Sequence, residues 1–146
     1  GEENATALMN YETAIKTDPK YSQTYSSRAA YWLQQGEYQK AIDDCQSAIK
    51  KGPHHAAYSI MGDAYFKLND YDNAIANYQL AKRIDSVVAQ AYYSRAKARK
   101  AKGQDKLAAE DLKNAVLLAP KFEIRTKSWF CLKTIFKLHQ NKYLVF

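Results

Sequence analysis

Residues 58–78 read YSIMGDAYFKLNDYDNAIANY, and this stretch decides the fold. It contains two small residues, Gly62 and Ala74, each followed at helical spacing by a tyrosine. Asn69 falls between the two halves, where a chain that turns from one helix into the next needs a residue that tolerates a left-handed backbone. The stretch therefore predicts two helices that are joined by a tight turn and pack closely where the small side chains meet.

The same pattern recurs along the chain at a nearly constant period. An alanine followed four residues later by a larger side chain occurs at Ala7, Ala41, Ala74 and Ala108, in steps of 34, 33 and 34 residues. A tyrosine followed four residues later by a small residue occurs in step with it, at Tyr25/Ala29, Tyr58/Gly62 and Tyr92/Ala96. Turn residues stand at Gly36, Asn69 and Gly103, and the units close at Pro19, Pro53, Ser86 and Pro120. A fixed period of this length is typical of a helical solenoid.

The repeat resembles the tetratricopeptide repeat, whose pattern is W-x2-L-G-x2-Y, then A-x3-F, then P. The central unit matches it with Tyr58-x2-Met61-Gly62-x2-Tyr65 and Ala74-x3-Tyr78. Three full repeats and half of another match, from residue 1 to about residue 120. The resemblance implies an all-α protein, a right-handed superhelix of antiparallel helix pairs with a concave groove.

We expect a single repeat domain over residues 1–146. Within it, residues 1–21 are the second half of a repeat, residues 22–54, 55–88 and 89–121 are repeats, and residues 122–146 form a capping helix and an apolar tail. Because Gly1 stands where the turn inside the first repeat would lie, we expect the chain to be an excerpt of a longer protein. The helices are expected near 4–17, 22–35, 38–51, 55–68, 71–84, 88–102, 105–118 and 123–140.

The last of these helices is amphipathic over residues 129–140, with Trp129 and Phe136 on its apolar half. Solenoids need a cap on their terminal repeats, so we expect this helix to cover the last one. Membrane-surface binding is the alternative. The apolar tail that follows favours a second alternative, self-association, through Trp129, Phe136, Tyr143 and Phe146.

Charge is distributed unevenly along the chain, whose net charge is +7. Residues 89–146 hold 13 basic and 4 acidic side chains, whereas residues 1–88 hold 9 and 11. Basic residues crowd one predicted helix and its turn: Arg95, Lys97, Arg99, Lys100, Lys102 and Lys106. A solvated helix face is the default interpretation, and a patch for phosphate or an acidic peptide is the alternative. We expect neither nucleic acid nor a membrane as the main partner, since the chain has no RNP-like motif, zinc spacing or long apolar run.

Two repeats carry an arginine where the family has leucine, Arg28 and Arg95, and each has an aspartate sixteen residues later, Asp44 and Asp111. The central repeat has Met61 and Asn77 at these positions. A partly buried guanidinium needs a hydrogen-bonded counter-charge, so we expect two structural salt bridges. Ligand binding by these arginines is the alternative.

In the family, ligands lie along the concave surface made by the first helix of each repeat, which implies a peptide-binding groove. The positions that map to it are Gln23, Ser26, Ser27, Ala30, Ser59, Ile60, Asp63, Phe66, Lys67, Gln90, Tyr93, Ser94, Lys97 and Lys100.

The segment Tyr25-Ser-Ser-Arg-Ala-Ala30 is similar to the chaperone-binding domains of Hsp70 and Hsp90 co-chaperones. Those domains hold a peptide carboxylate with a clamp of Lys, Asn and Arg side chains. In this sequence Ser27 replaces one Asn, Ala56 and Ile60 stand where a Lys and the Arg would be, and the next repeat offers Gln90 and Ser94. The helix that would carry the first Lys and Asn precedes Gly1, and at the positions present the clamp fails.

Nothing in the sequence favours catalysis or a cofactor. His54 and His55 are neighbours and His139 is distant, which does not fit a metal site. The carboxylate pairs are adjacent residues of predicted helices, Asp43/Asp44 and Glu110/Asp111, whose side chains point about 100° apart. Cys45 and Cys131 are isolated, which favours a reducing compartment, and we expect a cytoplasmic location.

We therefore expect a non-enzymatic adaptor that binds a peptide or helix of another protein in its groove. The alternatives are a self-associating structural module, a co-chaperone-like binder, and anionic-surface binding through the basic end.

Overall fold

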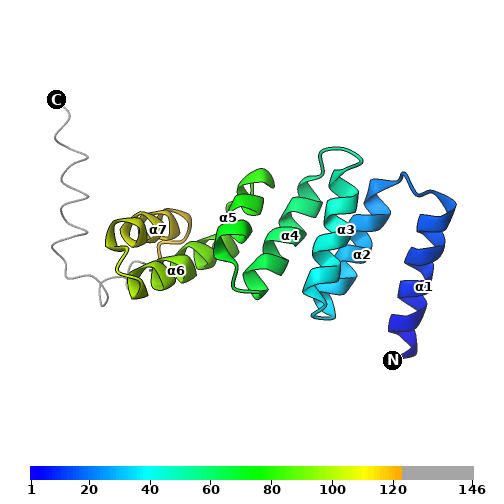
Figure 1. The fold of residues 1–146 in the computed structure, drawn as a ribbon, viewed down its shortest axis with the longest axis horizontal. Coiled ribbons are helices and arrows are strands. Elements are labelled where there is room, and N and C mark those ends of the chain that lie inside the picture. Colours follow the sequence, from blue (N-terminus) through cyan, green and yellow to red (C-terminus); the bar gives the residue numbers. More distant parts are fainter. Residues whose placement is uncertain (123–146) are drawn as a thin grey trace. The chain divides into compact units, whose positions relative to one another are not determined.

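The structure is a computed structural model, and it describes residues 1–122. This part of the chain is all α-helical, as predicted, and contains no strand (Figure 1). The helices are α1 (Glu2–Thr17), α2 (Ser22–Gln34), α3 (Tyr38–Ile49), α4 (His55–Lys67), α5 (Tyr71–Leu80), α6 (Ser86–Ala101) and α7 (Asp105–Leu118). The capping helix and the apolar tail that we expect after residue 122 lie outside the described residues.

The chain divides into two compact units. Unit 1 spans Gly1–Arg83 and contains α1 to α5, and unit 2 begins at Ile84 and contains α6 and α7. The single domain over residues 1–146 stays a prediction.

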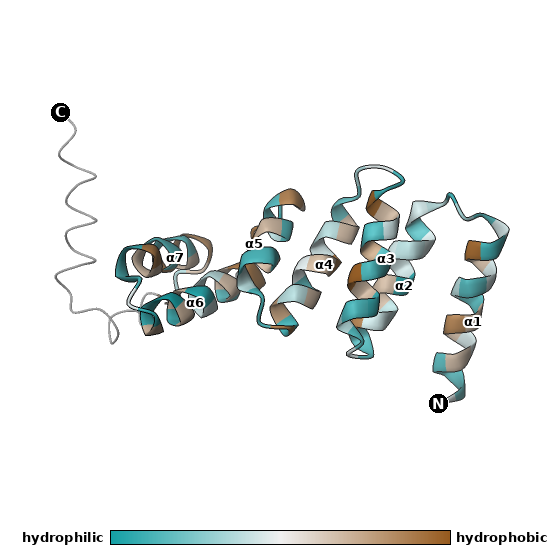
Figure 2. Ribbon diagram, viewed as in Figure 1, coloured by the Kyte–Doolittle hydropathy of each residue, from teal (hydrophilic) through white to brown (hydrophobic). Residues whose placement is uncertain are grey.

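In unit 1, α2 packs on α3 and α4 packs on α5, and further contacts join α3 to α4, α2 to α4 and α1 to α2. The core between these helices is built mainly from small side chains, with Ala29, Ala41 and Ala64 fully buried. Larger residues fill the remaining space, chiefly Ile42, Met61 and Tyr78. Figure 2 shows hydrophilic and hydrophobic residues on every helix, as expected for elements that bury one face and expose the other.

In unit 2, α6 packs on α7 through Ala96, Ala108 and Leu112, all of which are buried. Tyr93 and Phe122 are also buried, and their ring centroids lie 5.2 Å apart. The end of the described chain therefore contributes to the core of unit 2.

The turn inside each repeat has the left-handed backbone that the sequence predicts. Gly36, Asn69 and Gly103 have φ values of 78°, 61° and 73°. Only the central turn uses a residue with a side chain, and asparagine is among the residues that adopt this conformation most readily.

Several helix boundaries differ from the expected ones by one to four residues, and two of these differences have a clear local cause. Helix α5 ends at Leu80, four residues before the expected end at residue 84, because Lys82 adopts a left-handed φ of 53° and the Arg83 N–H donates to the Tyr78 carbonyl. Helix α6 begins two residues early, at Ser86, because the Asp85 side chain accepts hydrogen bonds from the N–H groups of Val87 and Val88.

No helix within residues 1–122 combines the length and the apolar character needed to cross a membrane.

Candidate functional site

The first helices of the two repeats in unit 1, α2 and α4, contact each other, and the positions predicted to face the groove are distributed along both. Gln23 and Lys67 are exposed. Six further positions are partly exposed: Ser27, Ala30, Ser59, Ile60, Asp63 and Phe66. The two helices therefore carry a row of accessible small, polar and apolar side chains, which we call the α2/α4 face.

Two of the predicted groove residues do not lie on an open face. Ser26 is 2% exposed, and its hydroxyl donates to the Gln23 carbonyl oxygen at 3.0 Å. Tyr93 is 8% exposed and packs on Phe122. Both side chains are therefore buried rather than open to a ligand, and their expected role as ligand contacts finds no support in this structure.

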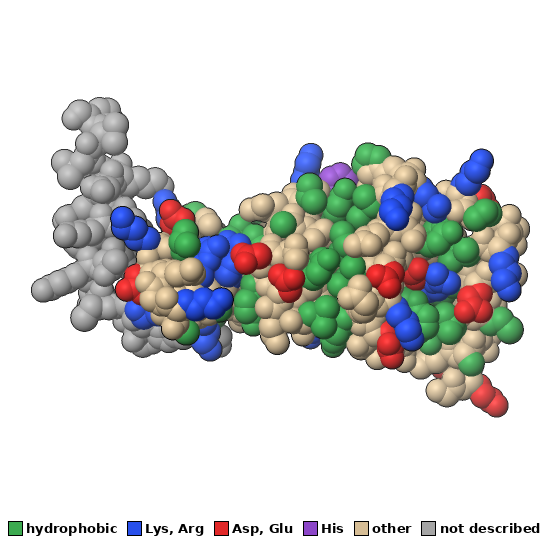
Figure 3. All heavy atoms as spheres, in the orientation of Figure 1, with side chains coloured by type: hydrophobic (Ala, Val, Ile, Leu, Met, Phe, Trp, Pro, Cys, Tyr) green, Lys and Arg blue, Asp and Glu red, His purple; other side chains and the backbone are tan. Residues whose placement is uncertain are grey.

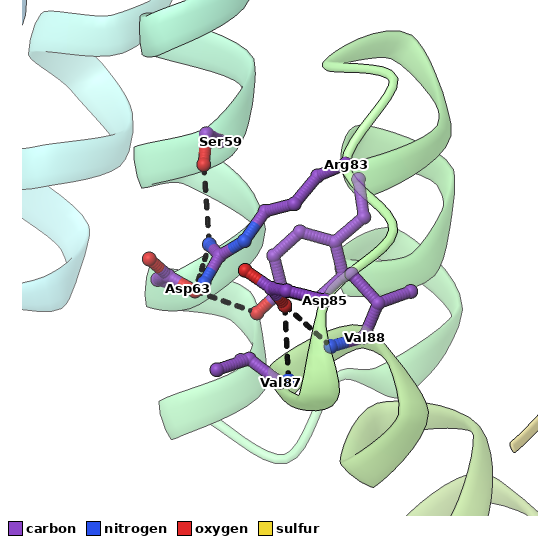
Figure 4. Close-up of polar contacts among 7 residues, drawn as sticks. Ser59, Asp63, Arg83, Asp85, Val87 and Val88 are labelled. Atoms are coloured by element: carbon purple, nitrogen blue, oxygen red, sulfur yellow. Dashed lines mark hydrogen bonds and ion pairs between the residues drawn. The ribbon is translucent and has the colours of Figure 1, made fainter. Parts of the chain in front are cut away.

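The α2/α4 face carries a fixed polar cluster centred on Arg83 (Figure 4). The Nη1 atom of Arg83 donates to Asp63 Oδ1 at 2.8 Å and to Ser59 Oγ at 3.1 Å. Ser59 and Asp63 lie one helical turn apart on α4, whereas Arg83 follows the end of α5. The side chains of Arg83 and Asp63 keep 21% and 28% of their exposure, so the ion pair remains accessible.

The cluster is anchored in the core by Tyr78. This tyrosine is fully buried, and its hydroxyl donates to Asp63 Oδ1 at 2.8 Å. The guanidinium of Arg83 also lies over the Tyr78 ring, 5.1 Å from its centroid. Asp63 thus accepts hydrogen bonds from both Arg83 and Tyr78, which fixes its carboxylate in one orientation.

Arg83 is absent from the site predicted from sequence. The expected helix over residues 71–84 places it on a helix surface, whereas the turn at Lys82 ends the helix and brings the guanidinium to α4. One sequence signal was overlooked. Asp63 is a carboxylate at a groove position, and it belongs to neither of the arginine–aspartate pairs that are separated by sixteen residues in the other two repeats.

The flanking repeat of unit 1 contains the ion pair expected between Arg28 and Asp44. Arg28 donates from Nε to Oδ2 and from Nη2 to Oδ1, both at 2.7 Å. These hydrogen bonds to the Asp44 carboxylate raise the pKa of the Arg28 guanidinium. The Asp44 side chain is only 8% exposed, so the ion pair that joins α2 to α3 has a structural role.

In unit 2, the Asp111 carboxylate accepts hydrogen bonds from two arginines, Arg95 and Arg99. Arg95 donates from Nε to Oδ2 at 2.9 Å and from Nη2 to Oδ1 at 2.7 Å, and Arg99 Nη1 donates to Oδ2 at 2.9 Å. The Asp111 side chain is only 2% exposed. The pairing of Arg95 with Asp111 is the one expected from sequence, and the participation of Arg99 is an addition.

The remaining predicted groove residues of unit 2 lie on α6. Gln90 and Ser94 are partly exposed and joined by a 3.3 Å hydrogen bond from Gln90 Nε2. Lys97 is exposed, and Lys100 is partly exposed with Asp105 3.5 Å from its Nζ atom. We call these four residues the α6 stripe. Figure 3 shows lysine and arginine side chains gathered over the α6 and α7 region in the view drawn.

Two of the residues considered for metal binding or catalysis, His54 and Cys45, have structural roles. His54 caps α4 by accepting a hydrogen bond from the Ala57 N–H at its Nδ1 atom. Cys45 is fully buried, and burial raises the pKa of its thiol to about 12. Within residues 1–122, no group of three or more His, Cys, Asp or Glu side chains is arranged to hold a metal ion.

Comparison with protein families gives three matches that together extend over the described helices. A family model described as tetratricopeptide repeat matches residues 89–122, and one described as TPR repeat matches residues 62–103. A third, described as anaphase-promoting complex, cyclosome, subunit 3, matches residues 3–81, just over half of the chain. The chain belongs to the tetratricopeptide-repeat (TPR) family.

Several curated TPR proteins are similar to this chain. The small glutamine-rich tetratricopeptide repeat-containing protein 2 of Mycosarcoma maydis is 36% identical over 80 residues, which cover 54% of this chain and 23% of the relative. The Hsp70-Hsp90 organizing protein 2 of Arabidopsis thaliana is 35% identical over 74 residues, which cover 50% of this chain and 13% of the relative. The TPR chain thus corresponds to a quarter or less of the length of these relatives.

Two solved structures share the TPR fold. Both are crystal structures of MamA, with TM-scores of 0.57 and 0.63 and sequence identities of 25% and 24%. The first match covers 77% of this chain and 66% of MamA, and the second covers 83% and 67%.

Proposed function

We propose that this TPR chain is a non-catalytic adaptor that binds a segment of another protein. The segment is a peptide or a helix, and it lies against the exposed first-helix positions of unit 1, on the α2/α4 face. The first-helix positions of unit 2, on α6, are a separate candidate surface. The cytoplasmic location expected from the sequence belongs to this proposal.

The observation that carries the proposal is the accessible ion pair of Arg83 and Asp63 on the α2/α4 face. Its two charged groups are held by Ser59 and Tyr78, so they do not have to be ordered when a partner arrives. Partly exposed apolar groups lie on the same helices, notably Ile60 and Phe66. Fixed polar groups beside apolar ones are the usual composition of a specific protein-binding surface.

A co-chaperone role is a narrower version of this function. The names of several relatives refer to Hsp70 and Hsp90, which favours it. The clamp positions that fall within residues 1–146, however, carry no charged side chain, since Ser27, Ala56 and Ile60 occupy them and the next repeat offers Gln90 and Ser94. A partner would therefore be recognised through other groups, such as the Arg83 cluster. From the anaphase-promoting complex match we likewise infer only protein binding.

The proposal is tested by blocking the α2/α4 face. Ala30→Arg combined with Ile60→Arg places two long cationic side chains on partly exposed positions of α2 and α4. The matched control is Gln46→Arg with Ala76→Arg, which adds the same charge at exposed positions of α3 and α5. Circular dichroism and thermal unfolding establish that both variants fold.

Proteins that the wild-type chain captures from the source cell are then identified and quantified for each variant, and each direct interaction is confirmed with the purified partner. We expect the blocking variant to lose partners that the control variant keeps. Equal binding of every partner by the blocking variant and the wild type would contradict the proposed use of this face.

A further inference from the structure

The cations of unit 1 that are not in ion pairs gather at one end of its helices. Residues 1–83 hold 9 basic side chains, and three of them form ion pairs: Arg28, Lys40 and Arg83. Within the part of the chain that the structure describes, the other six have no ion-pair partner: Lys16, Lys20, Lys50, Lys51, Lys67 and Lys82. Four of the six lie in the segments that follow the second helix of a repeat: Lys20 after α1, Lys50 and Lys51 after α3, and Lys82 after α5.

These connecting segments lie side by side at one end of unit 1 (Figure 1). Tyr25 joins the first two, because its hydroxyl donates to the Pro19 carbonyl oxygen at 3.2 Å and Lys51 Nζ lies 4.8 Å from its ring centroid. After α5, Arg83 donates to Ser59 Oγ near the start of α4. Figure 3 shows lysine or arginine side chains along this end, at the top of the view. We call five exposed side chains of these segments the joint edge: Lys20, Tyr21, Lys50, Lys51 and Lys82.

The two ends of unit 1 differ in the sign of their charge, although the unit as a whole is nearly neutral. Five basic side chains and one acidic side chain belong to the connecting segments, residues 18–21, 50–54 and 81–83. The turns inside the repeats, residues 35–37 and 68–70, contain two acidic side chains and no basic one. A local field of one sign attracts a partner of the other sign and orients it during encounter. The joint edge is therefore the part of unit 1 suited to an anionic surface.

The helix dipole explains only part of this charge. Lys50, Lys51 and Lys82 follow the C-terminal ends of α3 and α5, where cations are favoured. Lys20 instead stands beside Tyr21, the N-cap residue of α2, where the dipole disfavours a cation. The exposed ammonium of Lys20 thus has no structural role in unit 1.

The composition of the joint edge indicates the kind of anion that fits. All four of its cations are lysines, which act as point charges, whereas specific binding of a single phosphate or carboxylate favours the bidentate guanidinium of arginine. Apolar groups are exposed at the same end, since Tyr21 is 58% exposed and Leu80, the last residue of α5, is 55% exposed. The interface of an anionic bilayer accepts tyrosine rings and apolar side chains beside its charged headgroups. Nucleic-acid backbones and acidic peptides supply the charge without the apolar layer.

We propose that the joint edge of unit 1 binds peripherally to the surface of an anionic phospholipid bilayer. Its lysines attract the headgroups, and Tyr21 and Leu80 enter the interfacial layer. Lys100 of the α6 stripe differs from these lysines, because Asp105 already lies 3.5 Å from its Nζ atom. The joint edge lies at the ends of the helices and the α2/α4 face runs along them, so membrane attachment is independent of the proposed adaptor function.

Co-sedimentation with lipid vesicles measures the binding of the whole 146-residue chain. The vesicles contain phosphatidylserine and phosphatidylcholine in equal amounts, and vesicles of phosphatidylcholine alone are the control. The edge variant, Lys20→Gln with Lys50→Gln, removes two charges from the joint edge. The α7 variant, Lys106→Gln with Lys113→Gln, removes two charges from exposed positions of unit 2.

We expect the wild-type chain to bind the phosphatidylserine vesicles and not the phosphatidylcholine vesicles. The edge variant should bind at least about fivefold more weakly than the wild type, and the α7 variant within about twofold of it. Circular dichroism controls for folding. Equal weakening by both variants would show attraction by net charge alone and would overturn the assignment to the joint edge, as would unchanged binding by the edge variant.

Tyr21→Ser tests the apolar part of the proposed contact. Serine is a favoured N-cap residue, so the substitution removes the exposed ring without weakening the start of α2. We expect this variant to bind the phosphatidylserine vesicles at least about threefold more weakly than the wild type. Unchanged binding would overturn the proposed entry of Tyr21 into the bilayer interface.

Two soluble probes separate a bilayer from other anions. A fluorescein-labelled DNA duplex and a labelled polyglutamate peptide are titrated with the chain at the same ionic strength, and fluorescence anisotropy reports binding. We expect weaker binding of both probes than of the vesicles, and no effect of Tyr21→Ser on it. Tighter binding of either probe than of the vesicles, lost in the edge variant, would overturn the choice of a bilayer. The adaptor function is tested separately by Ala30→Arg with Ile60→Arg and stands if vesicle binding fails.

Discussion

Gly62 on α4 lies directly against the ring of Tyr78 on α5. A Cβ atom built on Gly62 would come within 2.6 Å of both Cδ1 and Cε1 of that ring and within 3.2 Å of the Ala74 carbonyl oxygen. The corresponding pairs, sixteen residues apart in the other repeats, are Ala29 with Cys45 and Ala96 with Leu112. Of the three pairs, the one with glycine at the first position has the largest side chain, tyrosine, at the second. The central repeat can hold Tyr78 in its core because Gly62 has no side chain.

Gly62→Ala tests this relationship against helix propensity. Propensity alone predicts a gain of about 1 kcal/mol, because alanine is the better helix former. We expect a net loss of about 1 to 3 kcal/mol instead, since the Tyr78 ring is fully buried and hydrogen-bonded and cannot move aside freely. Urea denaturation monitored by circular dichroism measures the free energy of unfolding.

Tyr78→Leu provides the control for this variant. Because leucine removes the ring that a Cβ at residue 62 would strike, adding Gly62→Ala to Tyr78→Leu should cost at least about 1 kcal/mol less than it does in the wild type. Additive losses would mean that the ring and the glycine are not coupled.

Asp111→Ala should destabilise the chain more than Asp44→Ala. Removing Asp44 leaves one partly buried guanidinium without its carboxylate, and we expect a loss of about 2 to 3 kcal/mol. Removing Asp111 takes the same carboxylate from two guanidiniums at once, so a loss of about 3 to 5 kcal/mol is expected. The free energy of unfolding of each variant is measured by chemical denaturation.

The exposed pair of Glu37 and Lys40 supplies the control for these two variants. Its oxygen and nitrogen atoms are 3.3 Å apart, and both side chains are more than half exposed. Glu37→Ala should therefore change stability by less than about 0.5 kcal/mol. A similarly small effect of Asp44→Ala would contradict the structural role of its pairing with Arg28.

Cys45 should resist thiol reagents in the native chain. Its ordinary pKa is 9.0, and burial raises the pKa to about 12, so the thiolate at pH 8 is about a thousandfold scarcer than in the unfolded chain. The experiment uses a Cys131→Ser background to isolate one thiol and follows reaction with Ellman's reagent with and without denaturant. Rapid reaction of the native thiol would show that the α3 core opens readily.

The raised pKa of Cys45 also predicts the direction in which the free energy of unfolding changes with pH. The folded chain retains a proton that the unfolded chain loses, so the stabilisation is complete below about pH 9 and is lost as the pH rises toward about 12. Cys45→Ala should therefore show a smaller fall in unfolding free energy across this range than the parent chain. Parallel pH profiles for the two proteins would contradict the shift.

Asp63→Ala should disrupt the Arg83 cluster from its centre. The substitution removes the acceptor for Tyr78 and the counter-charge of Arg83, and each lost hydrogen bond contributes about 1 kcal/mol, or more where a charge is involved. We expect a loss of about 2 to 3 kcal/mol by chemical denaturation. Tyr78→Phe, which deletes only the hydroxyl, should lose about 1 kcal/mol, and an equal loss from both would mean that Arg83 contributes nothing.

The features that were predictable from sequence are those coded by spacing within a repeat. The left-handed turns at Gly36, Asn69 and Gly103 follow from residue type at a fixed place in the period. The pairing of Arg28 with Asp44 follows because a fixed separation of sixteen residues connects two helices whose packing the repeat determines.

The features that could not be predicted depend on contacts with other parts of the chain that the repeat pattern does not encode. Arg83 reaches α4 only because Lys82 adopts a left-handed backbone, and a lysine gives no sequence signal for that conformation. Ser26 and Tyr93 were placed in the groove by helical register alone. Register gives the direction of a side chain and leaves open whether another group already covers it.

The Arg83 cluster affects how the central repeat can be exchanged between TPR proteins. A graft that ends at Leu80, the last residue of α5, would bring the tyrosine core of the donor repeat but leave its arginine behind. Asp63 would then keep its hydrogen bond from Tyr78 but lose the counter-charge that Arg83 supplies. A transferable repeat therefore extends to residue 83, so that Gly62, Tyr78 and the turn after α5 are moved together with Arg83.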